Sequence, residues 1–369
     1  MRATRAIIHL DNFQRNLNAV RMKIGPHPDI CFSVKADAYG HGAVQMARFA
    51  LETGVNSLAV ATVNEGLELR QAGIGAKILV LSQFLPEEIN DLVRADLIPL
   101  VSDRETIRSL ASAALGFSPL EVHLKVDTGL GRLGCRPEEA AELAALIARD
   151  KNLKLGGMAT HFSVADSADP ADIAYTKNQI ALFRETADSL RNAGIDPGKL
   201  HAANSGAIFF HKDSYFDMVR PGLLLYGYAP AGQTPGSLAV EPVMELRSAV
   251  VLIKKIRAGE EISYGRTWKA PEDTFIGNIP IGYADGLPRS LSNRHSVLIR
   301  GKAYPLTGTI CMDQCMVNLG NSGEVRLWDE AVIFGPGFKN AGNIARETGT
   351  IPYEILCNIN KRVPRVYFD

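Results

Sequence analysis

Short apolar runs alternate with longer amphipathic stretches from about residue 11 to about residue 230, and this alternation limits the possible folds most strongly. Short apolar runs bounded by turn signals are typical of buried strands, and apolar residues at three- and four-residue spacing are typical of helices. The runs that predict strands are residues 30–34, 57–61, 77–81, 97–101, 120–126, 154–160, 200–203 and 217–219. Helical spacing lies between them at residues 43–52, 63–72, 104–114, 137–149 and 171–193.

This α/β alternation predicts a (β/α)8 TIM-type barrel. An open doubly wound sheet is the alternative, and it requires a glycine-rich dinucleotide turn after an early strand. The sequence GLGRLG at residues 129–134 fits that pattern superficially. It follows the fifth predicted strand, however, and a lone match of this kind is weak.

The pattern changes after about residue 232, where long helical stretches become scarce and glycine, proline, asparagine and aspartate divide short strand-like runs. We therefore expect a barrel over residues 1–232 and a mostly β domain over residues 233–369, joined by a linker at residues 229–237. Residues 1–10 are candidates to pair with the second domain. Its predicted strands are residues 243–256, 261–264, 275–283, 296–300, 303–309, 316–319 and 331–334, and its predicted helices are residues 340–348 and 352–358.

Charge and hydropathy exclude several classes of partner. Forty basic residues balance forty acidic ones, so no overall field favours nucleic acid or an anionic membrane. No apolar stretch is long enough to span a membrane, and the first apolar run is interrupted too early for a secretion signal. We expect a cytoplasmic protein.

The five cysteines predict reduced thiols, because they are scattered and odd in number. Cys311 and Cys315 are four residues apart, but no second cysteine or histidine pair accompanies them at zinc-ligand spacing. We therefore expect small buried apolar residues there and no metal site. The full set is Cys31, Cys135, Cys311, Cys315 and Cys357.

Lys35 lies where the first predicted strand meets a turn, in the sequence SVKADAYGHG at residues 33–42. Apolar surroundings lower the pKa of a lysine, and its free amine can then condense with a carbonyl as a Schiff base. Tyr39 and His41 supply polar groups in the turn, whose glycines permit close backbone approach. The ordinary alternative is a lysine that extends from a strand end into solvent.

Other polar clusters also follow predicted strands, at the end of a barrel where function gathers. They are residues 125–134, Thr160 with His161, Asn204 with Ser205, and residues 220–222. The last two follow the seventh and eighth strands, where barrels often bind phosphate through hydroxyls and accessible amides. Either piece alone would be an ordinary helix cap or turn.

Eight motifs together resemble those of bacterial alanine racemases, and they lie in both predicted domains. They are residues 35–42, 125–134, 204–205, 220–222, 263–267 (SYGRT), 282–286 (GYADG), 308–313 (GTICMD) and 351–354 (IPYE). The resemblance implies a pyridoxal 5'-phosphate cofactor and the interconversion of L- and D-alanine, for peptidoglycan or for alanine catabolism. It also implies a homodimer whose active sites are shared between chains.

The resemblance assigns proton transfer to two residues. Lys35 carries the cofactor and acts on the α-carbon, and Tyr264 from the other chain is the second acid–base group. Racemisation removes the proton from one face of the α-carbon and returns a proton on the other face. Two acid–base groups on opposite sides of the substrate suit this task. Because tyrosine has an unperturbed pKa of about 10, its phenolate needs stabilising neighbours. By resemblance, His161 and Arg220 provide them as a hydrogen-bonded chain.

Arg220 is implied to face the cofactor's ring nitrogen. Arginine keeps its proton, so it donates to an unprotonated nitrogen and weakens the electron sink, which favours racemisation over transamination or decarboxylation. The resemblance assigns the remaining cofactor contacts to Tyr39, Asn204, Ser205, Gly222, the Leu223 amide and Tyr353.

The resemblance implies that Arg132 contacts either the substrate carboxylate or the cofactor's ring oxygen. It also implies that the backbone of Met312 contacts the substrate carboxylate. Asp313 supports this region. Lys125 is carbamylated by carbon dioxide in some relatives, where it holds the arginine. The alternative here is an unmodified lysine paired with Asp127 or another acid.

Tyr283, with Asp285 and Arg289, corresponds to the family's access corridor, and His201 is a further candidate to line it. Tyr283 and Tyr353 narrow its mouth, which favours a methyl-sized side chain, so alanine is preferred over serine. A binding pocket generally discriminates only weakly between substrates that differ by one methylene group.

Two other functions are weighed against the racemase. An amino-acid decarboxylase with a barrel and a β domain usually places a glutamate against the ring nitrogen, where this chain has Arg220. A non-catalytic cofactor-binding barrel resembles the barrel alone and lacks a domain that carries a residue such as Tyr264.

Overall fold

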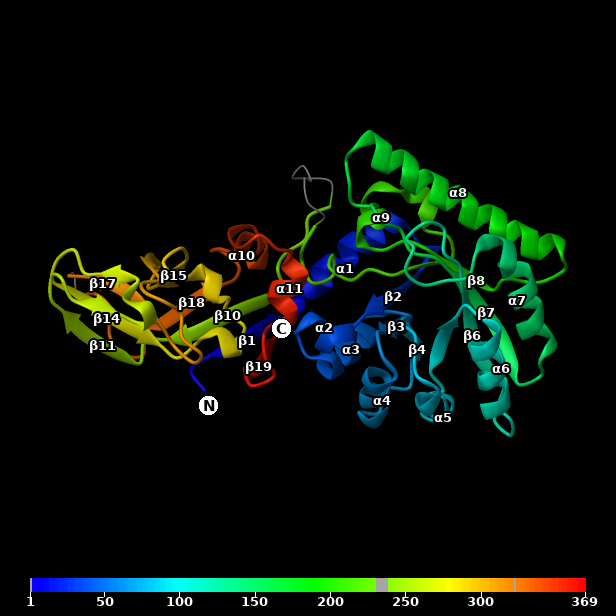
Figure 1. The fold of residues 1–369 in the computed structure, drawn as a ribbon, viewed down its shortest axis with the longest axis horizontal. Helices are drawn as coiled ribbons and strands as arrows, with labels where there is room; N and C mark the ends of the chain where they lie inside the picture. Colours follow the sequence, from blue (N-terminus) through cyan, green and yellow to red (C-terminus); the bar gives the residue numbers. More distant parts are fainter. Residues whose placement is uncertain (1, 230–237, 322) are drawn as a thin grey trace.

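The computed structural model describes residues 2–229, 238–321 and 323–369. Two parts lie end to end: a helix-covered barrel, and a mostly β part built from the C-terminal third of the chain (Figure 1). The predicted boundary at residues 232–233 and most of the predicted linker lie outside the described residues. No helix in the described ranges combines the length and the apolar character that crossing a membrane requires.

The barrel is closed, and its neighbouring strands are parallel throughout. Each of the runs predicted as strands in the first part of the chain forms one strand of the barrel. This confirms the predicted fold class. The strands are β2 (Asp29–Ser33), β3 (Ser57–Val60), β4 (Lys77–Val80), β5 (Ile98–Val101), β6 (Leu120–Lys125), β7 (Leu153–Ala159), β8 (Lys199–His201) and β9 (Met218–Val219).

Helices cover the outside of the barrel and bury their apolar faces against the strands, in the spacing that predicted them. Helix α1 and the short α5 are not among the predicted helices. The helices of this part are α1 (Leu10–Ile24), α2 (Lys35–Tyr39), α3 (Ala43–Glu52), α4 (Val63–Gln71), α5 (Ile89–Arg94), α6 (Arg104–Ala113), α7 (Pro137–Arg149), α8 (Pro170–Asn192) and α9 (Ser205–Phe210).

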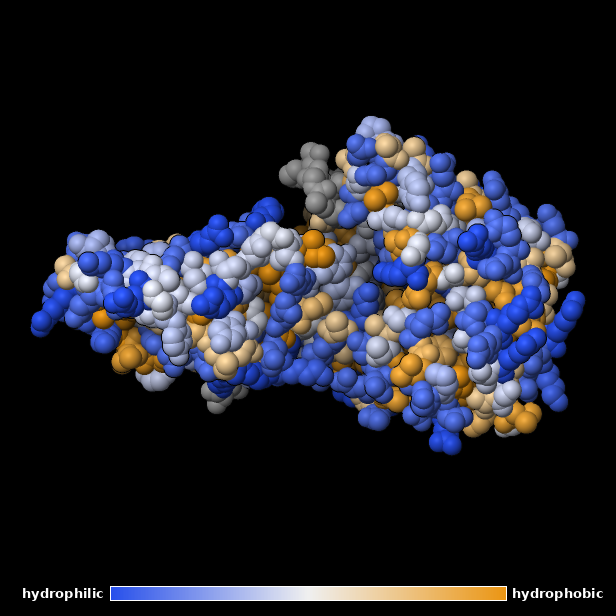
Figure 2. All heavy atoms as spheres, viewed as in Figure 1, coloured by the Kyte–Doolittle hydropathy of each residue, from blue (hydrophilic) through white to orange (hydrophobic). Residues whose placement is uncertain are grey.

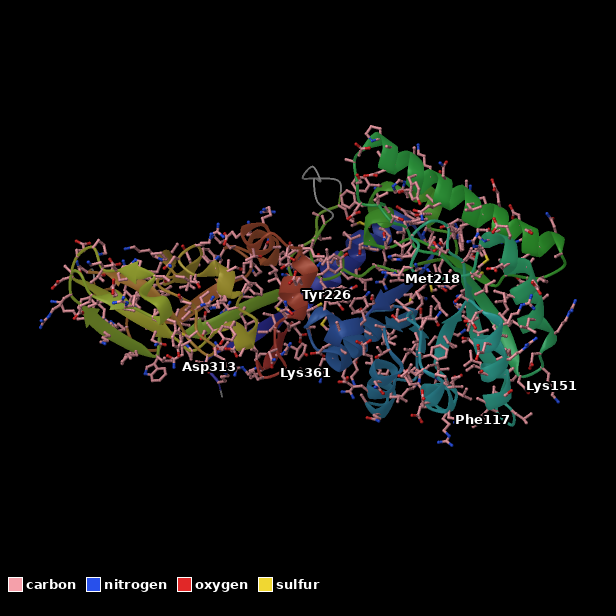
Figure 3. All side chains as sticks on the ribbon, in the orientation of Figure 1. Phe117, Lys151, Met218, Tyr226, Asp313 and Lys361 are labelled. Atoms are coloured by element: carbon pink, nitrogen blue, oxygen red, sulfur yellow. The ribbon has the colours of Figure 1, made fainter. Side chains whose placement is uncertain are left out.

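The inside of the barrel is divided into an apolar and a polar sector. The apolar cluster inside the barrel comprises Cys31, Ala59, Leu79, Ile98, Leu100, Ala159 and Met218, and Figure 3 shows Met218 among the barrel strands. Branched and other apolar side chains of this kind normally fill such a barrel in layers. Here His123, Lys125, His201 and Arg220 are buried as well, and these polar groups lead to the functional site.

In the described part of the C-terminal third, strands form one six-stranded sheet and two smaller ones, in the orders β16-β15-β18-β10-β1-β19, β11-β14-β17 and β12-β13. Strand β1 (Arg5–His9), from the chain start, pairs with β10 and β19. The other strands are β10 (Met244–Ala249), β11 (Leu252–Ile256), β12 (Glu261–Ile262), β13 (Trp268–Lys269), β14 (Thr274–Ile279), β15 (Ser296–Ile299), β16 (Lys302–Pro305), β17 (Cys315–Gly320), β18 (Glu330–Phe334) and β19 (Arg365–Phe368).

The predicted strand at residues 243–256 is wrong as one element, because it divides into β10 and β11 in different sheets. Three further predicted strands, at residues 261–264, 275–283 and 303–309, end early: β12 stops at Ile262, β14 at Ile279 and β16 at Pro305. Residues 264 and 283 instead each begin a 3-10 turn, η3 (Tyr264–Arg266) and η4 (Tyr283–Asp285). Two helices complete this part, α10 (Ala341–Thr348) and α11 (Pro352–Cys357), close to their predicted ranges.

Tyr226 contacts both the first barrel strand, β2, and the segment after β2 that contains α2. It lies at the junction of the two parts (Figure 3), is fully buried, and donates its hydroxyl to the Ser33 carbonyl at 2.9 Å. Its ring lies 4.7 Å from that of Tyr39 and 4.5 Å from that of His41, measured between centroids. Aromatic packing of this kind fixes α2 against the barrel end.

On the face drawn in Figure 2, hydrophobic residues are interspersed with hydrophilic ones over both parts. Scattered apolar residues are ordinary on a protein surface.

Candidate active site

A cavity of about 400 Å³ opens at the carboxyl ends of the barrel strands. This is the end at which barrel enzymes place their chemistry. Its wall includes most of the residues that the sequence assigned to cofactor and substrate. They are Lys35, Tyr39, Lys125, Arg132, His161, Asn204, Ser205, Arg220, Gly222, Leu223 and Tyr353.

Four basic side chains face this cavity: Lys35, Lys125, Arg132 and Arg220. No aspartate or glutamate is among its described lining residues, and none of the four has a carboxylate within 4 Å in the described ranges. Cations gathered without counter-charges repel one another and attract an anion. The cavity is therefore built for a ligand with several negative charges.

Lys35 was predicted to lie at the end of the first barrel strand. In the structure β2 ends at Ser33, and Lys35 is the first residue of α2. The next four residues, 36–39, have φ between 51° and 55°, so α2 is a left-handed turn. Such a conformation costs L-residues about 1–2 kcal/mol each, and strain of this kind gathers at functional sites. The Asp37 side chain holds the turn by accepting from the Ala43 amide at 2.8 Å.

The environment of Lys35 favours its neutral amine. Burial lowers the pKa of Lys35, and the nearby guanidinium of Arg132 lowers it further. Glu65 acts in the opposite direction, but its carboxylate oxygens accept from the amides of Ala36 and Ala61 instead. The predicted depression of the lysine pKa thus has a structural cause.

Arg220 is buried and is held by several acceptors. Its Nη1 donates to His201 Nδ1 at 2.8 Å, and its Nη2 donates to the Thr160 carbonyl at 2.7 Å and to His161 Nδ1 at 3.4 Å. Burial lowers the pKa of Arg220 to about 10, which leaves it a cation at neutral pH. Arg220 is thus a charged hydrogen-bond donor fixed at the cavity wall, with no carboxylate within 4 Å among the described residues.

Burial and the nearby cations lower the pKa of both His161 and Lys125. Burial and the adjacent Arg220 hold the pKa of His161 well below its usual value. Since His161 Nδ1 accepts from Arg220, its proton lies on Nε2. Burial, with Arg220 and Arg132, likewise holds the pKa of Lys125 well below its usual value.

The alternative interpretation, in which Lys125 pairs with Asp127, is not found in the structure. Asp127 uses both carboxylate oxygens within its own loop, where they accept from the amides of Gly129, Leu130 and Gly131 at 2.9–3.2 Å. A carboxylate satisfied by three amides is fixed in that loop. Lys125 is left facing the cavity beside Arg132.

The segments after β8 and β9 meet, as their places in the barrel predicted. Ser205 Oγ accepts from the amides of Gly222 at 3.0 Å and Leu224 at 3.3 Å, so its own hydroxyl proton is free to donate into the cavity. Asn204 caps α9 through the Ala207 amide. A Cβ on Gly222 would lie 2.7 Å from the Tyr39 hydroxyl, so glycine is required for this close approach.

Tyr353, from α11, completes the cavity rim. Its ring lies 5.6 Å from that of Tyr39, and burial raises the pKa of Tyr353 to about 12. Helix α11 comes this close because residue 40 is glycine: a Cβ there would lie 2.2 Å from the Leu356 carbonyl oxygen. Both tyrosines keep their protons and are hydrogen-bond donors at the rim.

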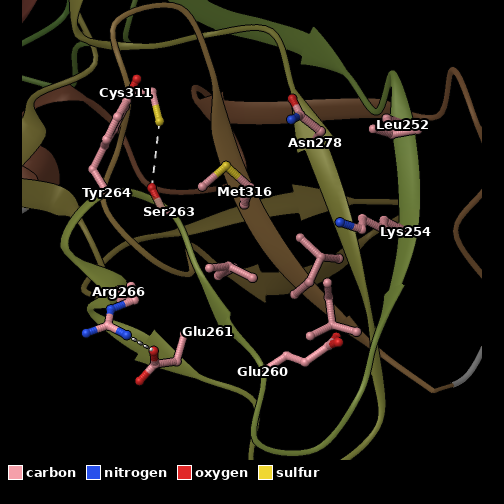
Figure 4. A pocket seen from close by; sticks show the side chains of 13 residues that line it. Leu252, Lys254, Glu260, Glu261, Ser263, Tyr264, Arg266, Asn278, Cys311 and Met316 are labelled. Carbon is pink, nitrogen blue, oxygen red and sulfur yellow. Dashed lines mark hydrogen bonds and ion pairs between the residues drawn. The ribbon is translucent and has the colours of Figure 1, made fainter.

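Tyr264, Met312, Asp313 and Tyr283 do not line this cavity; they lie in the β part. Figure 3 shows Asp313 there, well away from the barrel. Tyr264 is 71% exposed and borders a separate hollow of about 840 Å³, with Leu252, Met316 and Lys254 (Figure 4). Within one chain, therefore, Lys35 and Tyr264 belong to different sites.

The structure changes the interpretation of three further residues, His201, Asp285 and Cys311. His201 lies fully buried inside the barrel, so its assignment to an access corridor is wrong. Asp285 is buried too, and it forms ion pairs with Arg2 and Arg362. Cys315 is buried as expected, whereas Cys311 is only half-buried. The sequence did hold a signal for His201: an isolated histidine at the end of a buried strand requires a polar partner.

Comparisons with known proteins match both parts of the chain. Residues 8–230 match the profile of the alanine racemase N-terminal domain, and residues 243–367 match that of the C-terminal domain. The chain belongs to the alanine racemase family. The activity that accompanies this membership is the racemisation of alanine.

Individual alanine racemases are similar over the full length. That of Treponema denticola is 50% identical over 100% of this chain and 99% of its own. The structure of the Clostridium difficile 630 alanine racemase matches with a TM-score of 0.95 at 38% identity, covering 100% of this chain and 96% of the other. That from Bartonella henselae, described with covalently bound pyridoxal phosphate, matches with a TM-score of 0.87 at 27% identity over 100% of both chains.

For this alanine racemase we predict that Lys125→Met stabilises the cofactor-free protein in carbon-dioxide-free buffer. Burial disfavours the protonated lysine, whose pKa is lowered from its usual 10.5, so the unfolded chain binds more protons and wild-type stability rises with pH up to that value. The variant should gain about 1–4 kcal/mol near neutral pH. Its advantage should shrink toward pH 10.5. Urea unfolding at several pH values measures both effects, and an equally stable or weaker variant near pH 7 would contradict the buried-cation account.

Proposed function

We propose that this protein racemises alanine with pyridoxal 5'-phosphate, by proton transfer between two groups on opposite faces of the α-carbon. The product D-alanine would serve peptidoglycan, or the reaction would serve alanine catabolism. The observation that carries the proposal is a cavity of cations without carboxylates, centred on a lysine of lowered pKa.

The cavity fits this cofactor. Pyridoxal phosphate carries an aldehyde for Lys35, a phosphate for donors, and a ring nitrogen for Arg220. Ser205, Tyr39 and Tyr353 offer hydroxyl protons, and the Gly222 and Leu223 backbone lies at the same wall. Asn204 positions this segment as a helix cap. Bound there, the cofactor supplies an electron sink that makes the α-proton of alanine acidic.

Lys35 and Tyr264 are the proposed acid–base pair. The neutral Nζ of Lys35 takes or returns a proton on the face of the substrate that it meets, because its pKa is lowered toward the working pH. Tyr264 performs the complementary transfer at its hydroxyl. Since Tyr264 is exposed and borders another hollow, we infer that it enters the cavity of a second chain, in a head-to-tail homodimer with shared active sites.

Arg220 determines which reaction follows. Its guanidinium has only donors, so beside a ring nitrogen it prevents protonation and restrains the electron sink. Proton return to the α-carbon is then favoured over transamination or decarboxylation. The His161 Nε2 proton continues the chain from Arg220 toward the position proposed for the partner's tyrosine.

The substrate carboxylate has matching donors. We infer that Arg132 binds it, together with the backbone of Met312 from the second chain, where Asp313 and Arg362 form an ion pair beside Met312. Burial holds the pKa of Lys125, beside Arg132, well below its usual value, which favours the neutral amine that reacts with carbon dioxide. Carbamylation would convert it into an anion that orients Arg132. Tyr283 and Tyr353 narrow the access to side chains the size of methyl.

Racemisation is tested directly with L-alanine in deuterium oxide. The wild type should be yellow, should lose optical rotation, and should place deuterium on the α-carbon of both enantiomers. Lys35→Ala should lose the colour and at least about 10³-fold in kcat/KM, since it removes the cofactor linkage and one base. Lys23→Ala, a surface lysine on α1, is the matched control and should behave as wild type. A wild type that binds the cofactor without exchanging the α-proton would leave only a cofactor-binding protein.

Shared active sites are tested by mixing two inactive variants. Lys35→Ala lacks the base of the barrel, and Tyr264→Phe lacks the base of the β part. After subunit exchange, half of the chains pair as heterodimers, and each heterodimer has one intact and one doubly defective site. Activity should recover to about a quarter of wild type. No recovery, despite heterodimers detected by mass, would contradict the sharing of sites.

A further inference from the structure

Inside the barrel, a row of polar side chains runs from the active-site cavity to the opposite end. Arg220 Nη1 meets His201 Nδ1 at 2.8 Å, and His201 Nε2 meets His123 Nδ1 at 2.8 Å. His123 Nε2 meets Glu121 Oε1 at 3.3 Å. Both histidines are buried, whereas Glu121 borders a charged basin of about 620 Å³ at the amino ends of the strands.

Strand β6 supplies one side of this row. Glu121, His123 and Lys125 are alternate residues of β6, and alternate residues of a strand share a face. Glu121 therefore lies at the amino end of the strand, His123 in the middle, and Lys125 at the cavity. His201 comes from β8, and Arg220 follows β9, so the row crosses the barrel interior.

The direction of every hydrogen bond in the row is determined by its two ends. Arginine has only donors, so His201 Nδ1 must accept and the His201 proton must lie on Nε2. That proton is donated to His123 Nδ1, which places the proton of His123 on Nε2, directed at Glu121. A carboxylate is an acceptor, so the row ends consistently.

Both imidazoles are neutral in this arrangement. Burial and Arg220 hold the pKa of His201 well below its usual value, and burial lowers that of His123. Hydrogen bonds from His123 and Lys77 lower the pKa of Glu121 to about 2. The row thus has a cation at one end, an anion at the other, and two polarisable neutral rings between them.

The barrel makes room for this row. A Cβ on Gly157 of β7 would lie 2.8 Å from the His123 ring, and a Cβ on Gly156 would lie 2.3 Å from Glu121 Cγ. The pairing of β6 with β7 also shifts register between Val122 and His123. Two adjacent glycines and an irregular ladder inside a sheet mark a place where side chains approach the backbone closely.

We propose that Glu121 is a positioning residue for catalysis: through His123 and His201 it fixes the orientation of Arg220 and supplies the remote counter-charge of this cation. Arg220 has no carboxylate within 4 Å among the described residues, and an uncompensated buried cation is unfavourable. A polarised hydrogen-bonded row provides compensation without placing an acid against the cofactor. This inference rests on the proposed position of Arg220 at the ring nitrogen.

The first test reads the tautomers of the histidines in the holoenzyme. Nitrogen-15 NMR of protein labelled at histidine should show His201 and His123 neutral, with Nδ1 unprotonated and Nε2 protonated, near neutral pH. Either ring protonated on Nδ1, or carrying both protons, would overturn the proposal. Lack of cofactor or of racemisation in the wild type would instead refute the proposed function, so the two failures are distinguishable.

The second test removes the distal end. Glu121→Leu removes the acceptor, whereas Glu121→Gln keeps an acceptor without the charge. For Glu121→Leu we expect mixed tautomers, a shifted visible absorbance of the bound cofactor, and kcat lowered about tenfold with KM for alanine within about twofold, because one buried acceptor is lost. Glu121→Gln should retain the tautomers and show a smaller loss of kcat.

Lys77→Met is the matched control, because Lys77 pairs with Glu121 at 2.6 Å from outside the row. It should leave the absorbance, the tautomers and kcat unchanged. Wild-type spectra and kcat in Glu121→Leu, or the same losses in Lys77→Met, would overturn the proposal. If Glu121→Leu does not fold, Glu121→Gln and the wild-type tautomers decide: either ring in the other tautomer refutes the proposal, and so does an unchanged kcat in Glu121→Gln.

Discussion

The cavity and the barrel interior both depend on a buried arginine, Arg220, which has no carboxylate within 4 Å in the part of the chain that the structure describes. It donates to two carbonyls and two histidines at the end of the barrel. A nearby acid would compensate its charge more directly, but would also place a carboxylate at the proposed position of the cofactor. The barrel instead surrounds Arg220 with neutral acceptors and keeps the carboxylate of Glu121 at its far end. The chemistry of the cavity and the polar sector of the core have this common cause.

The same electrostatic arrangement prepares the other groups. With Arg220 and Arg132 at the wall of a buried site, the pKa values of Lys35, Lys125 and His161 are all lowered. Burial and the neighbouring cations therefore favour the neutral base that the proposed proton abstraction requires, and the same cations would attract the phosphate and the carboxylate of the proposed ligands. The proposed second base lies on the β part, so a second chain would bring a donor into the cavity without adding a carboxylate to it.

Much of this was predictable from sequence. Barrel strands are continuous apolar runs, since parallel sheets are buried on both faces, and the clusters at their carboxyl ends were therefore placed in one cavity. That residues 1–10 pair with the β part was predicted, but their partners β10 and β19 were not, because these strands are brought together from distant parts of the chain. The left-handed turn after Lys35 was missed as well, since no glycine marks residues 36–39.

The errors at the site have specific physical reasons. Asp127 was one alternative partner for Lys125 because the two are close in sequence, but three loop amides occupy its oxygens. His201 was placed on a corridor because single histidines give no direction, and its partner His123 is on another strand. Proximity in sequence does not determine which acceptor a buried donor reaches; the register of neighbouring strands does.

The most direct test of the central claim replaces Arg220 with glutamate and follows the products formed from L-alanine. Lys35, Lys125 and Arg132 remain in the cavity and can accommodate the new carboxylate. With an acid at the ring nitrogen, we expect racemisation to fall at least about tenfold. A measurable share of turnovers should then end in transamination, with pyruvate and the aminated cofactor as products. A folded, cofactor-bound Arg220→Glu variant that still forms only the two enantiomers of alanine, at the wild-type rate, would contradict the account.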